Sequence, residues 1–125
     1  GLSSQIHTKV GNFFIDTFPE NIDAVLFGHM MPIWSTERDA ALLRRAHAAL
    51  GAGGKVLLFN MMGDDDEVGP MTAALGSLYF LTTATGEGMM YSWREYESTL
   101  AAAGFRQTDR HVLPNDHGLL VGVKE

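Results

Sequence analysis

Residues 22–28 read Ile-Asp-Ala-Val-Leu-Phe-Gly, and residues 55–60 read Lys-Val-Leu-Leu-Phe-Asn. Both runs are almost continuously apolar, which is typical of parallel strands whose two faces are covered. The segment between them is long enough for one helix, and a strand, a helix and a strand in this order favour a right-handed βαβ unit. The fold class predicted from these two runs is therefore α/β.

The helix between the two strands has a recognisable start and end. Ser35 or Thr36 can cap its first turn, and Thr36 stands at capping-box spacing from Asp39. We expect the helix to run to Leu50, because Gly51 readily adopts the left-handed conformation that ends a helix.

Further helices and strands are predicted outside this unit. Residues 6–10 alternate apolar and polar side chains, which is the pattern of a short edge strand. Pro70 opens an unusually apolar helix, and the capping box in residues 92–95 begins another. Residues 105–113 and 119–124 flank a turn-rich linker and predict an antiparallel hairpin.

Composition limits the size and the partners of the protein. The 125 residues, 46% hydrophobic and 19% charged, suffice for one compact domain. The 15 acidic and 9 basic side chains give a net charge of −6 without a basic patch, so we expect no nucleic-acid partner. Cysteine is absent, and no apolar run approaches the roughly 20 residues that span a bilayer. We therefore expect a cytoplasmic protein with no membrane partner.

No metal is expected either. His7, His47, His111 and His117 lack the mutual spacing of metal ligands, and we interpret them as surface or helix-face residues. The acidic run at residues 64–67 lacks the alternating ligands and the closing glutamate of a calcium loop.

Three pieces of the sequence together carry a resemblance to a known family. They are Gly11-Asn12-Phe13-Phe14, the stretch from Trp34 to Gly54, and Ala103-Gly104-Phe105 before the hairpin. In order and spacing the chain resembles the carboxyl-terminal half of the small-molecule O-methyltransferases, Rossmann-like enzymes that use S-adenosylmethionine (SAM). The resemblance implies one partial domain over residues 1–125, with strands 3, 4, 5, 7 and 6 of the family sheet.

The resemblance also implies that strands 1 and 2, the glycine-rich cofactor loop and a dimerisation domain are absent. Residues 51–54 are rich in glycine but follow a helix, so we interpret them as a connector without a phosphate role. Without strands 1 and 2, strand 3 either shifts onto the edge of strand 4 or leaves that edge to another copy of the chain. We therefore expect a homo-oligomer.

Asn12, Phe13 and Gly28 are the candidate cofactor-binding residues by this resemblance. In the family, an acidic residue at the position of Asn12 reaches the adenine amino group, and the neighbouring apolar side chain packs on the ring. An asparagine oxygen can accept the same hydrogen bond, although Asn12 can equally serve only as a turn residue.

Five residues are the candidate binding set for a small-molecule acceptor: Met30, Met31, Trp34, Asn60 and Tyr79. Soft and apolar side chains suit a flat substrate beside a sulfonium. The alternative interpretation is that the methionines and the tryptophan are ordinary core residues.

The family's usual general base is missing from the sequence. Its histidine position holds Pro32, and Asn60 replaces the carboxylate that orients the histidine. His29 is therefore the candidate catalytic residue, and a hydrogen-bonded structural histidine is the alternative. Proximity and orientation alone can also drive methyl transfer to an acidic phenol or an enolate.

The function predicted by the resemblance is methyl transfer from SAM to an oxygen, less often a carbon, of an aromatic or polyketide-like molecule of secondary metabolism. The chain is expected to be an inactive fragment of that enzyme on its own. Two alternatives stay open: a non-catalytic binding or assembly module with the same fold, and an unrelated doubly wound protein such as a nucleotide-binding regulator.

Overall fold

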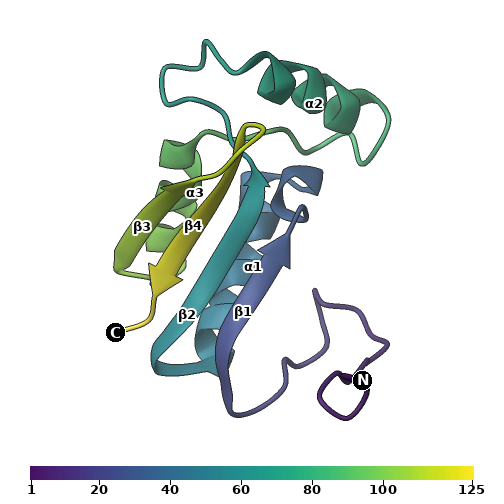
Figure 1. Ribbon diagram of the computed structural model, residues 1–125, viewed down its shortest axis with the longest axis vertical. Helices are drawn as coiled ribbons and strands as arrows, with labels where there is room; N and C mark the ends of the chain where they lie inside the picture. The colour runs from purple at the N-terminus through teal and green to yellow at the C-terminus, as the bar shows by residue number, and fades with distance from the viewer.

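One four-stranded sheet organises the molecule (Figure 1), and the computed structural model describes all of residues 1–125. The strands are β1 (Ile22–Gly28), β2 (Leu50–Met61), β3 (Gln107–Val112) and β4 (His117–Val123). They lie in the order β1-β2-β4-β3. β1 and β2 are parallel, whereas β4 is antiparallel to both of its neighbours. The predicted α/β class and the terminal hairpin are confirmed.

The predicted βαβ unit is also confirmed, with α1 (Thr36–Ala49) between β1 and β2. Ser35 is the N-cap, and its side-chain oxygen accepts the backbone N–H of Arg38 at 3.5 Å. The predicted capping box of Thr36 and Asp39 does not form, because the Asp39 side chain is turned into the protein and is only 1% exposed. The glycine-rich connector becomes the first part of β2.

Two more helices follow, α2 (Met71–Thr82) and α3 (Trp93–Ala102), and a short 3₁₀ helix, η1 (Met31–Ile33), precedes α1. The capping box predicted for α3 is present. The backbone N–H of Glu95 donates to Ser92 Oγ at 3.3 Å, and the Ser92 backbone N–H donates to the Glu95 carboxylate at 2.7 Å. These reciprocal bonds satisfy two donors that a helix start otherwise leaves without partners.

Arg110 joins the carboxyl-terminal hairpin to α3 and to the loop after β2 through ion pairs. The guanidinium of Arg110, on β3, lies 2.7 Å from the carboxylate of Asp65 and 2.5 Å from that of Glu97. Its hydrogen bonds hold the pKa of both carboxyls below their usual range. The same guanidinium lies 5.6 Å from the ring centroid of Trp93 at the start of α3.

The predicted strand at residues 6–10, strand 3 of the family order, is wrong. Residues 1–21 form turns and irregular coil, and no strand pairs with the outer edge of β1. An edge strand obtains its ladder hydrogen bonds only from a neighbouring strand, and none of the four strands of this sheet lies beside this segment. Phe14 and Phe18 pack against the core and hold the coil to the body.

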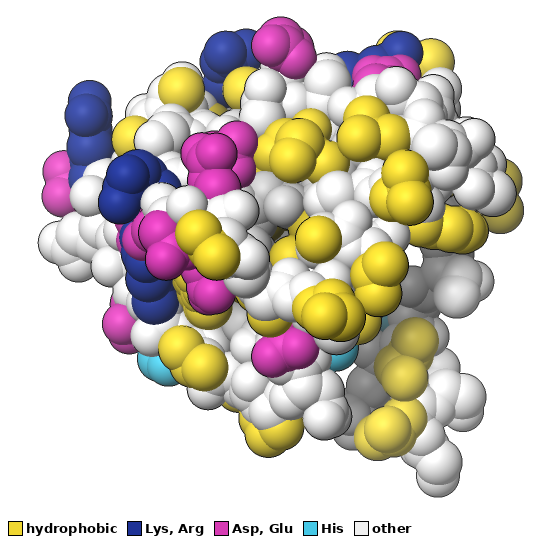
Figure 2. Space-filling model, turned by 90° about the horizontal axis from the view of Figure 1, so that it is seen from above, with side chains coloured by type: hydrophobic (Ala, Val, Ile, Leu, Met, Phe, Trp, Pro, Cys, Tyr) yellow, Lys and Arg dark blue, Asp and Glu magenta, His cyan; other side chains and the backbone are white.

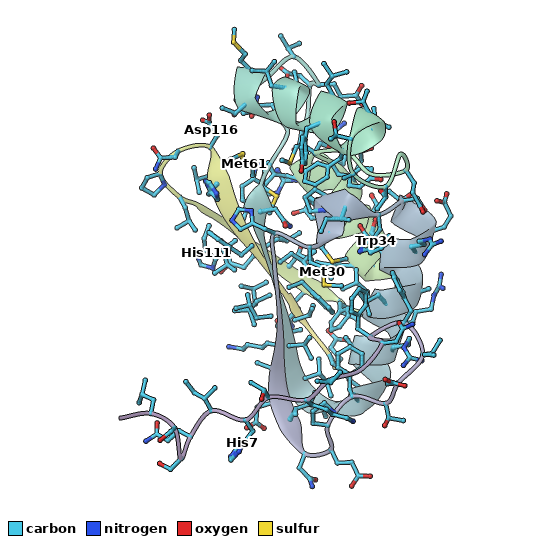
Figure 3. All side chains as sticks on the ribbon, turned by 90° about the vertical axis from the view of Figure 1, so that its right-hand side faces the viewer. His7, Met30, Trp34, Met61, His111 and Asp116 are labelled. Atoms are coloured by element: carbon cyan, nitrogen blue, oxygen red, sulfur yellow. The ribbon has the colours of Figure 1, made fainter.

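Helices cover only one face of the sheet (Figures 1 and 3), because α1 and α3 both lie on the same side. The core on that side includes Val25, Phe27, Val56, Leu58 and Leu120. On the opposite face Leu26 is 64% exposed. We call this second face the uncovered face; its side chains project into open space in Figure 3.

α2 lies across the carboxyl ends of β1 and β2 (Figure 1) and is itself poorly covered. Met71, Leu75 and Leu78 are exposed, and Ala73 is the only buried residue of the helix. Hydrophobic side chains are accordingly scattered over the top of the molecule in Figure 2. None of the helices has the length and apolar character needed to cross a membrane.

Candidate functional site

β1 and β2 end at the same edge of the sheet, and β4 begins there. Gly28 is in register with Phe59, and the backbone N–H of His29 donates to the Phe59 carbonyl oxygen at 2.8 Å. Met61 is in register with His117 at the start of β4. α/β proteins bind ligands at the carboxyl ends of parallel strands, so this edge is the candidate site.

Three aromatic rings pack together at this edge on the uncovered face. We call His29, Phe59 and His117 the three-ring cluster. The ring centroid of His29 lies 4.9 Å from that of Phe59 and 5.0 Å from that of His117, both edge to face. The rings of Phe59 and His117 are stacked, with centroids 5.3 Å apart. His29, the candidate base, is therefore exposed and held among aromatic neighbours.

The backbone of His29 is unusual. Its φ is 52°, in the left-handed region that residues other than glycine rarely adopt. Such conformations persist only where the surroundings impose them, and they concentrate at functional sites. The His29 side chain makes no hydrogen bond, and its position follows from its backbone bond to Phe59 and its ring contacts.

Asn12 and Phe13 lie in the coil before β1. The backbone N–H of Phe14 donates to Asn12 Oδ1 at 3.0 Å, so Asn12 does form a turn. The turn uses one lone pair of this oxygen and leaves the other for a ligand. Asn12 and Phe13 also line a cavity of about 270 Å³, which is enough for a flat heterocycle such as adenine.

Gly28 marks the open end of β1. It is exposed, and a Cβ built at this position would meet nothing within 4 Å. A ligand can therefore approach the end of the strand without displacing a side chain.

Trp34 connects the coil to the start of α1. Its ring lies 6.3 Å from that of Phe13 and 5.0 Å from that of Phe14, edge to face in both pairs. The Trp34 side chain and that of Met30 lie on the α1 side of the sheet in Figure 3. Met31 is fully buried, and Met30 packs against the same core, so the structure places the two methionines in or against the core.

Asn60 and Tyr79 lie apart from the three-ring cluster. Asn60 is fully buried on the helix-covered face, and neither its amide nitrogen nor its oxygen has a hydrogen-bond partner. Tyr79 is 56% exposed on α2, where its ring packs against Phe80. A cavity of about 330 Å³ beneath α2 is lined by neither residue.

The buried carboxyl of Asp39 is an electrostatic feature that the sequence did not indicate. Neither of its oxygens has a hydrogen-bond partner, and burial raises the pKa of Asp39 to about 8. The hydroxyl of Tyr96, on α3, is also buried without a partner. Burial, and secondly the charge of Asp39, raise the pKa of Tyr96.

His117 is the residue of the candidate site that sequence reasoning missed. The sequence alone predicts a surface residue, because His117 lies far along the chain from His29 and in no motif. The usable signal is the hairpin, since an antiparallel last strand begins at the edge where its parallel neighbour ends.

Comparisons with known proteins give a family match. Residues 1–106 match the family model of the O-methyltransferase domain. The chain is 42% identical over 128 residues to the L-tyrosine C(3)-methyltransferase of Streptomyces lavendulae, covering 99% of the chain and 35% of that protein. It is 34% identical over 126 residues to the 3-hydroxy-5-methyl-1-naphthoate 3-O-methyltransferase of Streptomyces sahachiroi, covering 99% of the chain and 36% of that protein.

A solved structure shares the whole arrangement. The SAM-dependent methyltransferase SibL, in its apo form, superposes with a TM-score of 0.89 at 39% identity, covering 99% of this chain and 37% of SibL. The chain thus spans about a third of the length of the relatives that it matches.

Proposed function

Because the chain belongs to the O-methyltransferase domain family, we propose that it is the carboxyl-terminal part of a methyltransferase catalytic domain that acts on an aromatic or polyketide-like small molecule. SAM is the methyl donor of this enzyme family. Relatives of the chain act on small molecules through oxygen or through carbon. The chain's own contribution is then one wall of the cofactor site and one wall of the acceptor site.

The observation that carries the proposal is the shared edge at Gly28 and Phe59. The three-ring cluster lies at this edge, and the cavity lined by Asn12 and Phe13 lies in the coil that precedes β1. A methyl donor and an acceptor would have to meet at this edge, and bringing them together is itself a large part of catalysis.

The residues present fit the adenosine end of the cofactor. Asn12 would accept a hydrogen bond from the adenine amino group, Phe13 would pack on the ring, and Gly28 would leave room beside the strand end. The bound cofactor supplies an electrophilic methyl group on a sulfonium. The ribose and the rest of the donor require residues outside this chain.

On the acceptor side, His29 stays a candidate for the base, and Met30, Met31, Trp34, Asn60 and Tyr79 stay candidates for binding. A phenolate carries negative charge on its oxygen and on the ring carbons next to it. Deprotonation therefore prepares an acceptor for methylation at either atom. Oxygen is our first choice, and a ring carbon is the second, favoured by the likeness to the L-tyrosine C(3)-methyltransferase.

A non-catalytic binding module is the other candidate function. Its support is that Pro32 and Asn60 occupy the positions of the family's base and orienting carboxylate, and that both side chains are buried. A proline has no group that can take a proton.

A chimera tests the proposal with the chain as it stands. Residues 1–125 would replace the matched third of the S. lavendulae enzyme, and the same enzyme without that third is the control. We expect the chimera to bind SAM in calorimetry and to convert L-tyrosine or another phenol into a product heavier by one methylene. Fragmentation in mass spectrometry then tells oxygen from carbon.

Two outcomes would count against the proposal. A folded chimera that binds SAM but methylates none of a broad panel of phenols favours the binding module. A folded chimera that does not bind SAM removes the cofactor assignment as well.

A further inference from the structure

We propose that His117 accepts the hydroxyl proton of the acceptor, while His29 and Phe59 hold the acceptor's ring beside it. This inference deepens the proposed function and rests on it. Two observations carry it: the fixed hydrogen position on the His117 ring and its place in the three-ring cluster.

The ring of His117 is held in one tautomer. Its Nδ1 lies 2.7 Å from the backbone carbonyl oxygen of Asn115. A carbonyl oxygen only accepts, so Nδ1 carries the hydrogen, and in the neutral ring Nε2 has a free lone pair. The turn that presents this carbonyl is unusual, because Asn115 and Asp116 have φ values of 60° and 57°. The loop thus orients the ring before any ligand arrives.

The position of His117 suits an aromatic acceptor. Its ring stacks on Phe59 and meets the edge of His29, and all three side chains lie on the uncovered face at the carboxyl ends of β1 and β2. Aromatic rings favour offset or edge-to-face contacts with one another, so a flat substrate ring could extend this stack. The hydroxyl of a ring bound in that way would come close to Nε2.

The other histidines are not available for this role. His47 packs edge to face on Phe105 on the helix side, and His111 lies 3.2 Å from the carboxylate of Asp109 on β3. His7 lies in the coil at the opposite end of the molecule, as Figure 3 shows.

Two carboxylates lie next to His117. His117, Asp64 and Asp116 line the same small cavity of about 210 Å³. Asp116 also accepts a hydrogen bond of 2.8 Å from the Thr72 hydroxyl of α2, which fixes its position. From β1 the titratable group facing His117 is His29, and β2 contributes only the neutral Phe59 and Met61.

The proton-transfer step balances without a further reactant. The O–H bond of the acceptor breaks, its proton bonds to Nε2 of His117, and the electron pair stays on the oxygen as a phenolate. The products of this step are an imidazolium and a phenolate. The imidazolium returns its proton to water after the methylated product has left.

The test uses His117→Asn in the chimera described above. The asparagine amide can still donate to the Asn115 carbonyl, but it has no basic nitrogen. With L-tyrosine we expect kcat/KM to fall by about 100-fold or more, the usual contribution of a general base. With a nitrophenol, whose hydroxyl is already ionised near neutral pH, we expect only a small loss. His7→Asn is the matched control and should behave as the unchanged chimera.

The outcomes separate the possible roles. Equal losses on tyrosine and nitrophenol would mean that His117 only supports the structure, and no loss on tyrosine would also overturn the proposal. If His29→Asn shows the tyrosine-selective loss and His117→Asn does not, the proton goes to His29.

If the unchanged chimera methylates nothing, the proposed function fails, and ¹⁵N NMR of the 125-residue chain with p-cresol decides on His117. A change in the Nε2 signal of His117 on adding p-cresol supports a phenol-binding histidine. An Nε2 signal of His117 that does not change on adding p-cresol would contradict the inference.

Discussion

The phenolic hydroxyl of Tyr91 donates a 2.8 Å hydrogen bond to the backbone carbonyl oxygen of Trp34. The bond joins the residues just before α3 to those just before α1. Burial raises the pKa of Tyr91 to about 12, so the hydroxyl keeps the proton that it donates at any ordinary pH. The position of Trp34, just before α1, therefore depends on Tyr91, which lies far from it in the sequence.

Tyr91→Phe should lower the free energy of unfolding by about 1 kcal/mol, because it removes this bond and leaves the Trp34 carbonyl without its partner. Urea denaturation measures the change. Tyr79→Phe is the matched control, since the ring of Tyr79 is exposed on α2. Equal stability of the Tyr91→Phe variant and the wild type would show that water replaces the bond at no cost.

Asp39→Asn should change how stability depends on pH. In the unfolded chain the Asp39 carboxyl loses its proton near pH 4, whereas burial in the folded state raises its pKa to about 8. Between these values unfolding releases a proton, so the free energy of unfolding falls as pH rises and levels off above about 8. Because the asparagine side chain cannot ionise, the variant escapes this loss. Its free energy of unfolding at pH 8 should exceed that of the wild type by up to about 5 kcal/mol.

Denaturation curves from pH 4 to pH 9 check this expectation. Glu37→Gln is the control, because Glu37 is an exposed carboxyl on the same turn of α1 and its loss should leave the slope in place. A wild type whose stability is flat across this range would mean that Asp39 ionises inside the fold.

Arg110→Met should loosen the hairpin from α3. The substitution keeps an unbranched apolar stem against Trp93 but removes the ion pairs with Asp65 and Glu97. These side chains are partly exposed, so we expect a loss of about 1 kcal/mol that shrinks at high salt. The measurement is denaturation at two salt concentrations, with Arg106→Met as the control. A loss independent of salt would point to packing as the cause.

The ion pairs of Arg110 also predict a response to acid. Folding lowers the pKa of Asp65 and that of Glu97. The two carboxylates therefore add to the free energy of unfolding above their unfolded-state pKa values near pH 4. This stabilisation disappears as the pH falls through their folded-state pKa values. The difference in the free energy of unfolding between the wild type and Arg110→Met should therefore become smaller in acid.

Self-association is the outcome that we expect for the isolated chain. The outer edge of β1 has no partner, and Leu26 on the uncovered face is 64% exposed. Leu26→Lys should reduce association in sedimentation experiments, since a charged side chain protects an open edge. Val68→Lys, at an exposed loop position, is the control. A wild type that stays monomeric at high concentration would contradict the expectation.

Local patterns predicted most of the fold. The apolar runs ending at Gly28 and Asn60, the capping box at Ser92 and the turn-rich linker before β4 each lie in the structure where the pattern placed them. In these cases the determining interactions lie within a few residues of one another or within one hydrophobic run. The segment at residues 6–10 failed because alternation alone cannot supply the neighbour that a strand requires.

The candidate site was less accessible from the sequence, because it depends on contacts between distant segments. His29 could be selected from its place after an apolar run, and Gly28 from the resemblance to the O-methyltransferases. His117 could not, since its meeting with His29 depends on the register of β4 against β2. The burial of Asp39 likewise arises from the packing of α1 on α3, whereas its spacing from Thr36 predicted a capping box.

The two tryptophans of the chain lie in separate environments, and this gives the molecule two built-in optical reporters. Trp34 is half-buried between Phe14 and the Arg38 guanidinium, whereas Trp93 is buried against Gly118 and beneath Arg110. With one tryptophan replaced by phenylalanine, the emission spectrum of the other would follow either the docking of the amino-terminal coil or the closure of the hairpin. The order in which these two ends join the sheet is therefore open to direct observation without any attached dye.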